Sequence, residues 1–395
     1  MSRFASIEIA PPDPILGLNE LFKADQRSGK VNLGVGVFVN SEGKTPTFQC
    51  ITEAGRRIVA ENGTKTYLPI TGLPKYTSAA KGLIFGTDLP EHLISAQTPG
   101  GTGALRVAGD FIFKNLPNAK VWVSNPSWAN HKGIFAAAGL DVQSYAYFDP
   151  TQNGIDREAF FAAISEIPAT DVVVFHACCH NPTGADLSAD DWKKVATIAQ
   201  EKGWTPLIDC AYQGFGEGLD TDAQGVRTMA ASGVPFFLAQ SFSKNFGLYQ
   251  DRVGAIHIAC TNSEEATRVA SRLKTSIRVN YSNPPAHGAH LVAAVLGDAG
   301  LTSQWEEELD TMRIRINGVR TQFVAKMAAA GVSRDFSFLE QQRGMFSFTG
   351  LNREQAIKMR EDFGVYMVES GRINVAGLTD KNIDYVVDAI KQTLN

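Results

Sequence analysis

The sequence predicts an α/β protein in which helices flank a mostly parallel sheet and a smaller α+β lobe completes the chain. Between about residues 46 and 300, helical patterns alternate with short apolar runs that end in polar or glycine-rich turns, as buried parallel strands do. From about Leu301 the pattern changes to long, charged helical stretches with few strands. At 395 residues, the chain is also too long for one compact core.

The apolar runs are rich in valine, isoleucine and phenylalanine, which favours strands. They occupy residues 121–124, 171–175, 205–209, 236–239 and 253–258. Residues 188–202 illustrate the helices between them, because Ser188 can cap the first turn, acids follow it, and Gly203 can end the helix.

The carboxyl-terminal part predicts a long helix over residues 301–330, broken only at Gly318. After it we expect a strand at 345–349, a helix at 352–363, a strand at 366–368 and a last helix at 380–394. Residues 31–39 are expected to join this lobe. The predicted domains are therefore a large domain (46–300), a small domain (15–45 with 301–395), and an arm (1–14) that three prolines keep extended against a neighbouring subunit.

Composition restricts the function. The chain is 44% hydrophobic and 20% charged, and its net charge is −4 without long runs of either sign, so we expect no nucleic-acid partner. No apolar run approaches the roughly 18 residues of a membrane span, and the first residues do not resemble a secretory signal. Five cysteines, two of them adjacent, do not form a disulfide framework, so a reducing, cytoplasmic location is expected.

Residues able to do chemistry follow several predicted strands, where open α/β sheets bind ligands. Lys244 lies just past one strand, among small polar residues. Partial desolvation would free its lone pair to attack a carbonyl, although a lysine there could equally extend into water. Asp209 ends a second strand. The glycine-rich turn at residues 99–104 precedes a helix and could hold a phosphate, with Arg252 adding charge.

These residues resemble those of the aspartate and aromatic amino-acid aminotransferases, pyridoxal-phosphate enzymes of fold type I. The resemblance spans essentially the whole chain. Its motifs are Ser241-Phe242-Ser243-Lys244-Asn245-Phe246-Gly247-Leu248-Tyr249, Tyr281-Ser282-Asn283-Pro284-Pro285 and Gly371-Arg372-Ile373-Asn374-Val375-Ala376-Gly377. It implies a large domain with a mostly parallel seven-stranded sheet flanked by helices, a smaller α+β domain, and pyridoxal 5'-phosphate as cofactor.

The resemblance also implies the catalytic roles. Lys244 would bind the cofactor aldehyde as an aldimine and move the proton between substrate and cofactor. Asp209 would keep the pyridine nitrogen protonated, with His131 supporting it from behind. Tyr212 and Asn181 would hydrogen-bond the phenolic oxygen, and Trp128 would stack on the ring. The phosphate would be bound by Gly101, Thr102, Ser241, Ser243 and Arg252, together with Tyr67 of the partner subunit.

For the substrate, the resemblance implies that Arg372 pairs with the α-carboxylate, aided by Asn181 and the backbone near Gly36. Arg278 from the partner subunit would pair with a distal carboxylate, which makes the protein a homodimer with shared sites. The expected reaction is reversible amino transfer from L-aspartate to 2-oxoglutarate, giving oxaloacetate and L-glutamate by a ping-pong mechanism.

Three alternatives remain at this point. An aromatic or dual-specificity aminotransferase would share every catalytic residue. Thr102 and Asn283 resemble the aspartate group, whereas Val39, Thr66 and Tyr67 resemble the aromatic group. Another pyridoxal-phosphate reaction, such as β-decarboxylation, and a cofactor-free binding protein are weaker candidates. We expect no metal site, because the histidines and cysteines of residues 176–180 are too closely spaced for a zinc finger.

Overall fold

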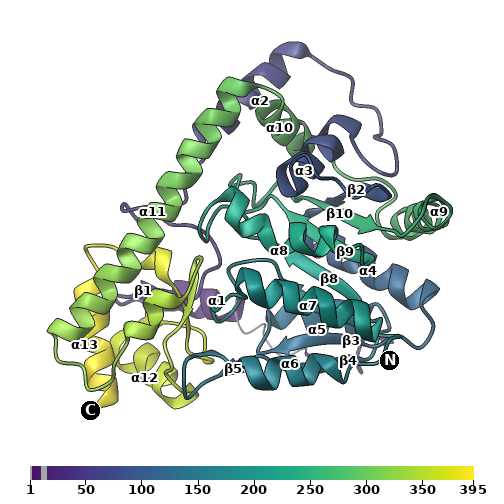
Figure 1. The fold of residues 1–395 in the computed structure, drawn as a ribbon. Coiled ribbons are helices and arrows are strands. Elements are labelled where there is room, and N and C mark those ends of the chain that lie inside the picture. Colours follow the sequence, from purple (N-terminus) through teal and green to yellow (C-terminus); the bar gives the residue numbers. More distant parts are fainter. Residues whose placement is uncertain (1, 10–15) are drawn as a thin grey trace.

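The computed structural model describes residues 2–9 and 16–395, so the three prolines of the predicted arm lie outside the described residues. Its centre is a seven-stranded sheet in the order β2-β10-β9-β8-β7-β3-β4 (Figure 1). β10 runs antiparallel to both its neighbours and the other pairs are parallel, which confirms the predicted sheet. The strands are β2 (Leu93–Pro99), β3 (Val121–Asn125), β4 (Val142–Ala146), β7 (Val172–His176), β8 (Thr205–Cys210), β9 (Phe236–Ser241) and β10 (Val253–Ala259).

Helices cover both faces of the sheet (Figure 1). Alternate residues of one strand serve opposite faces: Phe237 packs in the core below one helical layer, and Phe236 and Leu238 pack below the other. The first layer contains α4 (Gly100–Asn115), α5 (Ala129–Ala137) and α9 (Ser263–Asn280). The second contains α3 (Pro74–Phe85), α6 (Arg157–Ser165), α7 (Ala189–Lys202) and α8 (Leu219–Ala231). This double cover explains why β7, β8, β9 and β10 are mostly apolar and buried along most of their length.

Helix α7 begins and ends as the sequence predicts. Ser188 accepts a hydrogen bond from the N–H of Asp191 at 3.1 Å, and Asp191 accepts one from Ser188 at 2.9 Å, which completes a capping box. Gly203 ends the helix with a φ of 81°, a conformation that favours glycine.

The second lobe joins the amino-terminal segment to the carboxyl-terminal third. β1 (Val31–Asn32) pairs in parallel with β12 (Val365–Tyr366), and β11 (Phe346–Phe348) pairs antiparallel with β13 (Arg372–Asn374). Leu33, Phe323 and Val387 belong to one buried cluster of this lobe. Its helices are α1 (Leu16–Ala24), α12 (Arg353–Phe363) and α13 (Ile383–Leu394). The exact domain boundaries stay predictions.

Helix α11 (Ala299–Ala329) links the two lobes (Figure 1). Trp305 packs in the core that also contains Phe242, whereas Phe323 packs in the small-lobe cluster. The prediction that Gly318 breaks this helix was wrong. Gly318 is exposed, and the buried residues Ile316 and Arg320 on either side hold the helix across it, which outweighs the roughly 1 kcal/mol by which glycine disfavours a helix.

The remaining elements are short or peripheral. They are α2 (Gln49–Glu61), α10 (His287–Leu296), β5 (Phe148–Asp149), β6 (Gly154–Ile155) and the 3-10 turns η1 (Ser337–Gln341) and η2 (Val375–Gly377). α2 and α10 pack against α11 at the end of the molecule away from the small lobe (Figure 1). None of the helices in the described residues combines the length and the apolar character that crossing a membrane requires.

Candidate active site

The carboxyl ends of the central strands surround a cavity of about 460 Å³ between the two lobes. Its lining brings together most of the residues that the sequence singled out. They are Gly36, Gly101, Thr102, Trp128, Asn181, Asp209, Tyr212, Ser241, Ser243, Lys244, Arg252 and Arg372. This volume lies in the range of small-molecule sites.

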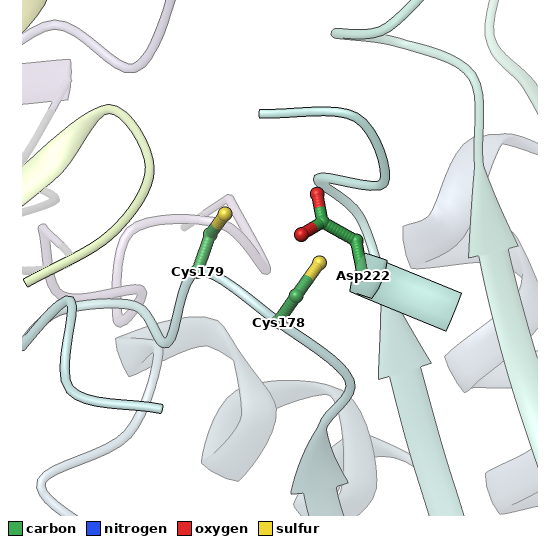
Figure 2. Close-up of side chains that lie close together, drawn as sticks. All are labelled: Cys178, Cys179 and Asp222. Atoms are coloured by element: carbon green, nitrogen blue, oxygen red, sulfur yellow. The ribbon is translucent and has the colours of Figure 1, made fainter. Parts of the chain in front are cut away.

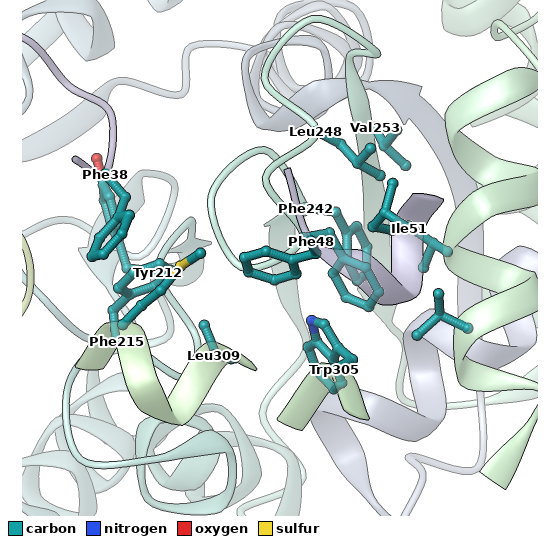
Figure 3. Close-up of a cluster of buried hydrophobic side chains, with 14 of the residues drawn as sticks. Phe38, Phe48, Ile51, Tyr212, Phe215, Phe242, Leu248, Val253, Trp305 and Leu309 are labelled. Atoms are coloured by element: carbon teal, nitrogen blue, oxygen red, sulfur yellow. The ribbon is translucent and has the colours of Figure 1, made fainter. Parts of the chain in front are cut away.

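Lys244 is held in this cavity by the turn after β9. The turn is anchored from below, because Phe242 packs with Phe48 and Trp305 (Figure 3) and the indole N–H of Trp305 donates to the Asn245 carbonyl at 2.7 Å. The ammonium lies 4.6 Å from the centre of the Tyr212 ring. Desolvation lowers the pKa of Lys244 to about 8 against the opposing charge of Asp209. An amine with this pKa is partly unprotonated near neutral pH and can act as nucleophile and base.

Asp209 stands at the end of β8 and is 6% exposed. Its Oδ2 lies 3.0 Å from Nε2 of His131, whose Nδ1 lies 2.8 Å from Oγ of Ser127. Burial acts to raise the pKa of Asp209, but the His131 hydrogen bond and the charge of Lys244 outweigh it and leave that pKa lowered. The carboxylate is therefore ionised and can pair with a protonated ring nitrogen. His131 contacts Asp209 without lining the cavity, and its supporting role stays a prediction.

A cradle for a phosphate forms where β2 meets α4. Gly101 lies in the first turn of α4, where backbone N–H groups are free to bind an anion. Arg252 reaches the same place and donates from Nη1 to Oγ of Ser243 at 3.2 Å. Gly100 has a φ of +74°, and a Cβ there would lie 2.5 Å from Nη2 of Arg252, so the approach of the guanidinium requires glycine.

Arg372 of β13 enters the cavity from the small lobe and is 3% exposed. It donates to Oδ1 of Asn181 at 3.2 Å and to the Gly34 carbonyl at 2.8 Å, and its carbon Cζ lies 4.2 Å from the centre of the Phe346 ring. Burial lowers its pKa to about 10, no described carboxylate compensates it, and its Nε has no partner. A buried guanidinium in this state is suited to a bidentate carboxylate from a ligand.

Two predicted site residues lie away from the cavity of this chain. Tyr67 is 91% exposed, and Arg278 is exposed at the end of α9, where it donates to Oγ of Ser282. Their roles, which require a partner subunit, stay predictions. Asn283 donates to the Leu68 carbonyl at 3.0 Å and, like the predicted rim residues Val39 and Thr66, does not line the cavity.

The sequence reasoning missed several residues that line the cavity. They are Asn19, Val35, Val37, Leu105, His176, Ala211, Tyr249 and Phe346. Tyr249 closes the lysine motif and its hydroxyl accepts the N–H of Phe38 at 3.0 Å, so its place in the motif was a usable signal. Phe346 offers no such signal, because only the pairing of β11 with β13 brings it to Arg372.

One cluster of potential metal ligands occurs among the described residues. The ligand atoms of Cys178, Cys179 and Asp222 lie within 4.8 Å of one another (Figure 2). Asp222 already accepts three backbone N–H groups, from Gly214, Gly216 and Glu217, at 2.8–2.9 Å. We assign no metal to this cluster, and the predicted absence of a metal stays a prediction.

The donor set fits pyridoxal phosphate, because a lysine with a lowered pKa, an ionised aspartate and the residues of an anion cradle all line one cavity. Fold and site together therefore define a pyridoxal-phosphate-dependent enzyme of fold type I. Comparison with known proteins identifies the family within this class. Residues 28–390 match the family model described as aminotransferase class I and II, and the chain belongs to that family.

Its relatives fall into two groups. The chain is 49% identical over 395 residues to an aspartate aminotransferase of Escherichia coli (strain K12), covering 99% of this chain and 100% of that one. It is 44% identical over 391 residues to an aromatic-amino-acid aminotransferase of the same organism, covering 98% of each. Among solved structures, the aromatic-amino-acid aminotransferase of Burkholderia pseudomallei covalently bound to pyridoxal phosphate superposes with a TM-score of 0.97 at 46% identity over 100% of both chains.

Proposed function

We propose that this protein is an aspartate:2-oxoglutarate aminotransferase that works by a ping-pong mechanism. The observation that carries the proposal is that one cavity holds both a desolvated Lys244 and a buried Arg372 with no carboxylate partner among the described residues. The lysine supplies the base and the arginine supplies the receptor for an α-carboxylate. The 49% identity to an aspartate aminotransferase over 395 residues supports aspartate as substrate.

The cofactor's contribution, when bound, is an electron sink that stabilises negative charge at the substrate Cα. Lys244 would hold and move the proton at the substrate Cα, because its amine is a base that lines the cavity. Asp209 would keep the ring nitrogen protonated, with His131 holding Asp209 in place. Tyr212 and Asn181 would donate to the phenolic oxygen, and Trp128 would stack on the ring.

The phosphate is assigned to residues from the start of α4, the end of β9 and the segment between β9 and β10. They are Gly101, Thr102, Ser241, Ser243 and Arg252, with Tyr67 of a partner subunit completing the set. The guanidinium of Arg252 and the N-terminus of α4 would neutralise the charge of the phosphate and so hold the cofactor in position.

A dicarboxylate substrate needs a second cation besides Arg372. The other cations that line the cavity, Lys244 and Arg252, are already assigned to the base and to the phosphate. We assign that role to Arg278 of a partner subunit, where its exposure on this chain leaves it available. The protein would then act as a homodimer with shared sites. The amino-terminal arm fits the same assembly, since Phe4, Ile7 and Ile9 are 77%, 68% and 98% exposed. The composition supports a cytoplasmic location.

A second candidate function, aromatic amino-acid transamination, is favoured by one feature. A mostly apolar cavity of about 790 Å³ adjoins the site through Trp128 and Arg372 and is lined by Leu18, Leu21 and Val368 among others. It offers space for a ring beside the carboxylate receptor. The measurement that separates the candidates is kcat/KM for aspartate against phenylalanine. Comparable values would establish dual specificity, and a large preference for phenylalanine would overturn the aspartate assignment.

Transamination itself is tested on the purified holoenzyme. Aspartate alone should convert the bound cofactor to its amine form in a single turnover, which is visible in the absorbance spectrum, and 2-oxoglutarate should reverse the change. A Lys244→Ala protein should complete neither half-reaction at an appreciable rate. Multiple turnovers at a near-native rate in that variant would refute the proposal.

A further inference from the structure

The loop between β7 and α7 carries Asn181 and has an unusual backbone. Cys179 has a φ of 51° and Gly184 a φ of 69°, so a residue with a side chain occupies the left-handed region. Such a conformation costs roughly 1–3 kcal/mol and persists only where surrounding contacts determine it. The loop therefore requires an anchor that fixes Cys179 and the residues directly after it.

Asp186 provides such an anchor from the other end of the loop. Its Oδ2 accepts the N–H of Cys179 at 2.6 Å, and its Oδ1 accepts the N–H of His180 at 2.7 Å. The N–H of Gly184 donates to the His180 carbonyl at 2.6 Å and closes the loop on itself. One carboxylate thus binds two successive peptide groups, and bonds of this charge-assisted kind are about twice as strong as neutral ones.

Asn181 is the next residue after the two anchored peptides. It is 6% exposed, lines the cavity, and accepts a hydrogen bond at Oδ1 from Nη1 of Arg372 at 3.2 Å. Because Oδ1 faces the arginine, its amide N–H groups remain to donate to a ligand. Asp186 itself does not line the cavity. Any effect that it has on the reaction must therefore pass through the loop.

We propose that Asp186 is a positioning residue whose carboxylate, by binding the N–H groups of Cys179 and His180, aims Asn181 at both the cofactor's phenolic oxygen and Arg372. The proposal rests on the proposed function, since it presupposes that Asn181 donates to that oxygen. It differs from a merely structural role, in which Asp186 stabilises the loop without any effect on the cofactor.

Two opposing influences act on the ionisation of Asp186. Burial raises its pKa to about 7, and the N–H groups of His180 and Cys179 act in the opposite direction. The loop bonds therefore favour the carboxylate form, in which both oxygens accept.

Asp222 supplies a matched control in the same region (Figure 2). Burial also raises its pKa, and it too accepts backbone N–H groups, from Gly214, Gly216 and Glu217. No residue of that segment lines the cavity. Asp222 lies beside the thiols of Cys178 and Cys179 and its charge raises the pKa of Asp186, so replacing it removes a neighbouring buried charge while both loop bonds of Asp186 stay in place.

The experiment compares the holoenzyme forms of Asp186→Asn, Asp222→Asn and Asn181→Ala. The asparagine amide keeps the size of the side chain but turns an N–H toward one of the two donors, so one loop bond is lost. The readout is the pH midpoint of the bound cofactor's absorbance change, which falls when donors stabilise the phenolate form. Hydrogen exchange of the Cys179 and His180 amides provides a second readout that needs no cofactor.

We expect Asn181→Ala and Asp186→Asn to raise the midpoint by about 0.5 to 1 pH unit, as loss of one hydrogen bond to a charged oxygen implies. Asp222→Asn should change the midpoint by less than about 0.2 pH unit. Asp186→Asn should also speed exchange of both amides and lower kcat/KM for aspartate by about tenfold. Asp186→Ser, which keeps one acceptor oxygen, should shift the midpoint in the same direction and serves as the test if the asparagine protein does not fold.

The outcomes distinguish failure of the role inferred for Asp186 from failure of the proposed function. If Asn181→Ala shifts the midpoint while the Asp186 variants move it no more than Asp222→Asn does, Asp186 is only structural and the inference is wrong, although the proposed function stands. If Asn181→Ala leaves the midpoint unchanged, the proposed role of Asn181 is itself refuted and the inference falls with it.

Discussion

The cost of keeping Lys244 in its cavity can be measured directly on the apoprotein. Replacing Lys244 by methionine preserves the length of the side chain and removes the charge. Desolvation lowers the pKa of this lysine from 10.5 to about 8. Each pH unit of such a change corresponds to about 1.4 kcal/mol, so the folded state loses about 3 kcal/mol by holding the ammonium. We expect Lys244→Met to raise the free energy of unfolding at pH 7 by about this amount.

The pH dependence distinguishes this explanation from simple repacking. Below pH 8 the lysine is charged in both the folded and the unfolded chain, so the full cost is present. As the pH rises from 8 to 10.5, the folded chain releases the proton first and the cost disappears. The advantage of the methionine variant should therefore vanish over this interval in urea unfolding, measured at equal protein concentration without cofactor. An advantage that stays constant with pH, or no advantage at all, would refute the reasoning.

Three further predictions follow from the same contacts. Arg372→Leu should lower kcat/KM for aspartate by about a thousandfold, because two charge-assisted hydrogen bonds to the substrate are lost. An unchanged kcat/KM in steady-state kinetics would contradict the assignment of Arg372 as the carboxylate receptor. Asp209→Ala should reduce the single-turnover rate with aspartate by about a thousandfold, as breaking a buried charge pair implies. Ser165→Ala on α6 is the control, and it should leave that rate unchanged because α6 is remote from the cavity. Trp305→Phe should lower the free energy of unfolding in urea by about 1–2 kcal/mol, because the bond to the Asn245 carbonyl is lost and that carbonyl is left buried; an unchanged midpoint would show that the bond does not anchor the lysine turn.

The sheet could be predicted where strands are uniformly apolar and not elsewhere. β7, β8, β9 and β10 are buried on both faces, so each contains a mostly apolar run. β2 was missed because its buried end contains Gln97 and Thr98, which are 1% and 0% exposed. Gln97 is satisfied there by the Leu73 N–H and the Pro285 carbonyl, contacts that no local pattern reveals. β4 was missed because it is an edge strand with one half-exposed face.

The same distinction applies to the site. Asp209 and Lys244 could be identified because they follow predicted strands, and the carboxyl ends of parallel strands meet at one edge. Val35 and Val37 reach the cavity through contacts with a segment more than 300 residues away, such as the bonds from Asn374 to their carbonyls, and Phe346 reaches it through the pairing of β11 with β13. Sequence position carries no information about that pairing. The anchor of the Asn181 loop is similarly hidden, because Asp186 resembles an ordinary helix-preceding acid until its two acceptor bonds are seen.

The roles proposed for Arg372 and Arg278 connect the candidate site with the proposed homodimer. Arg372 is buried, hydrogen-bonded on two sides and placed over Phe346, so its direction is fixed before substrate arrives. Arg278 is exposed, and its one hydrogen bond within the described part of the chain goes to the nearby Ser282, so little there fixes its direction. A receptor for the carboxylate common to all amino acids gains from rigidity, whereas a receptor for a variable side chain can tolerate displacement. The same chemistry could therefore serve aspartate when Arg278 of a partner points inward and an aromatic side chain when it does not.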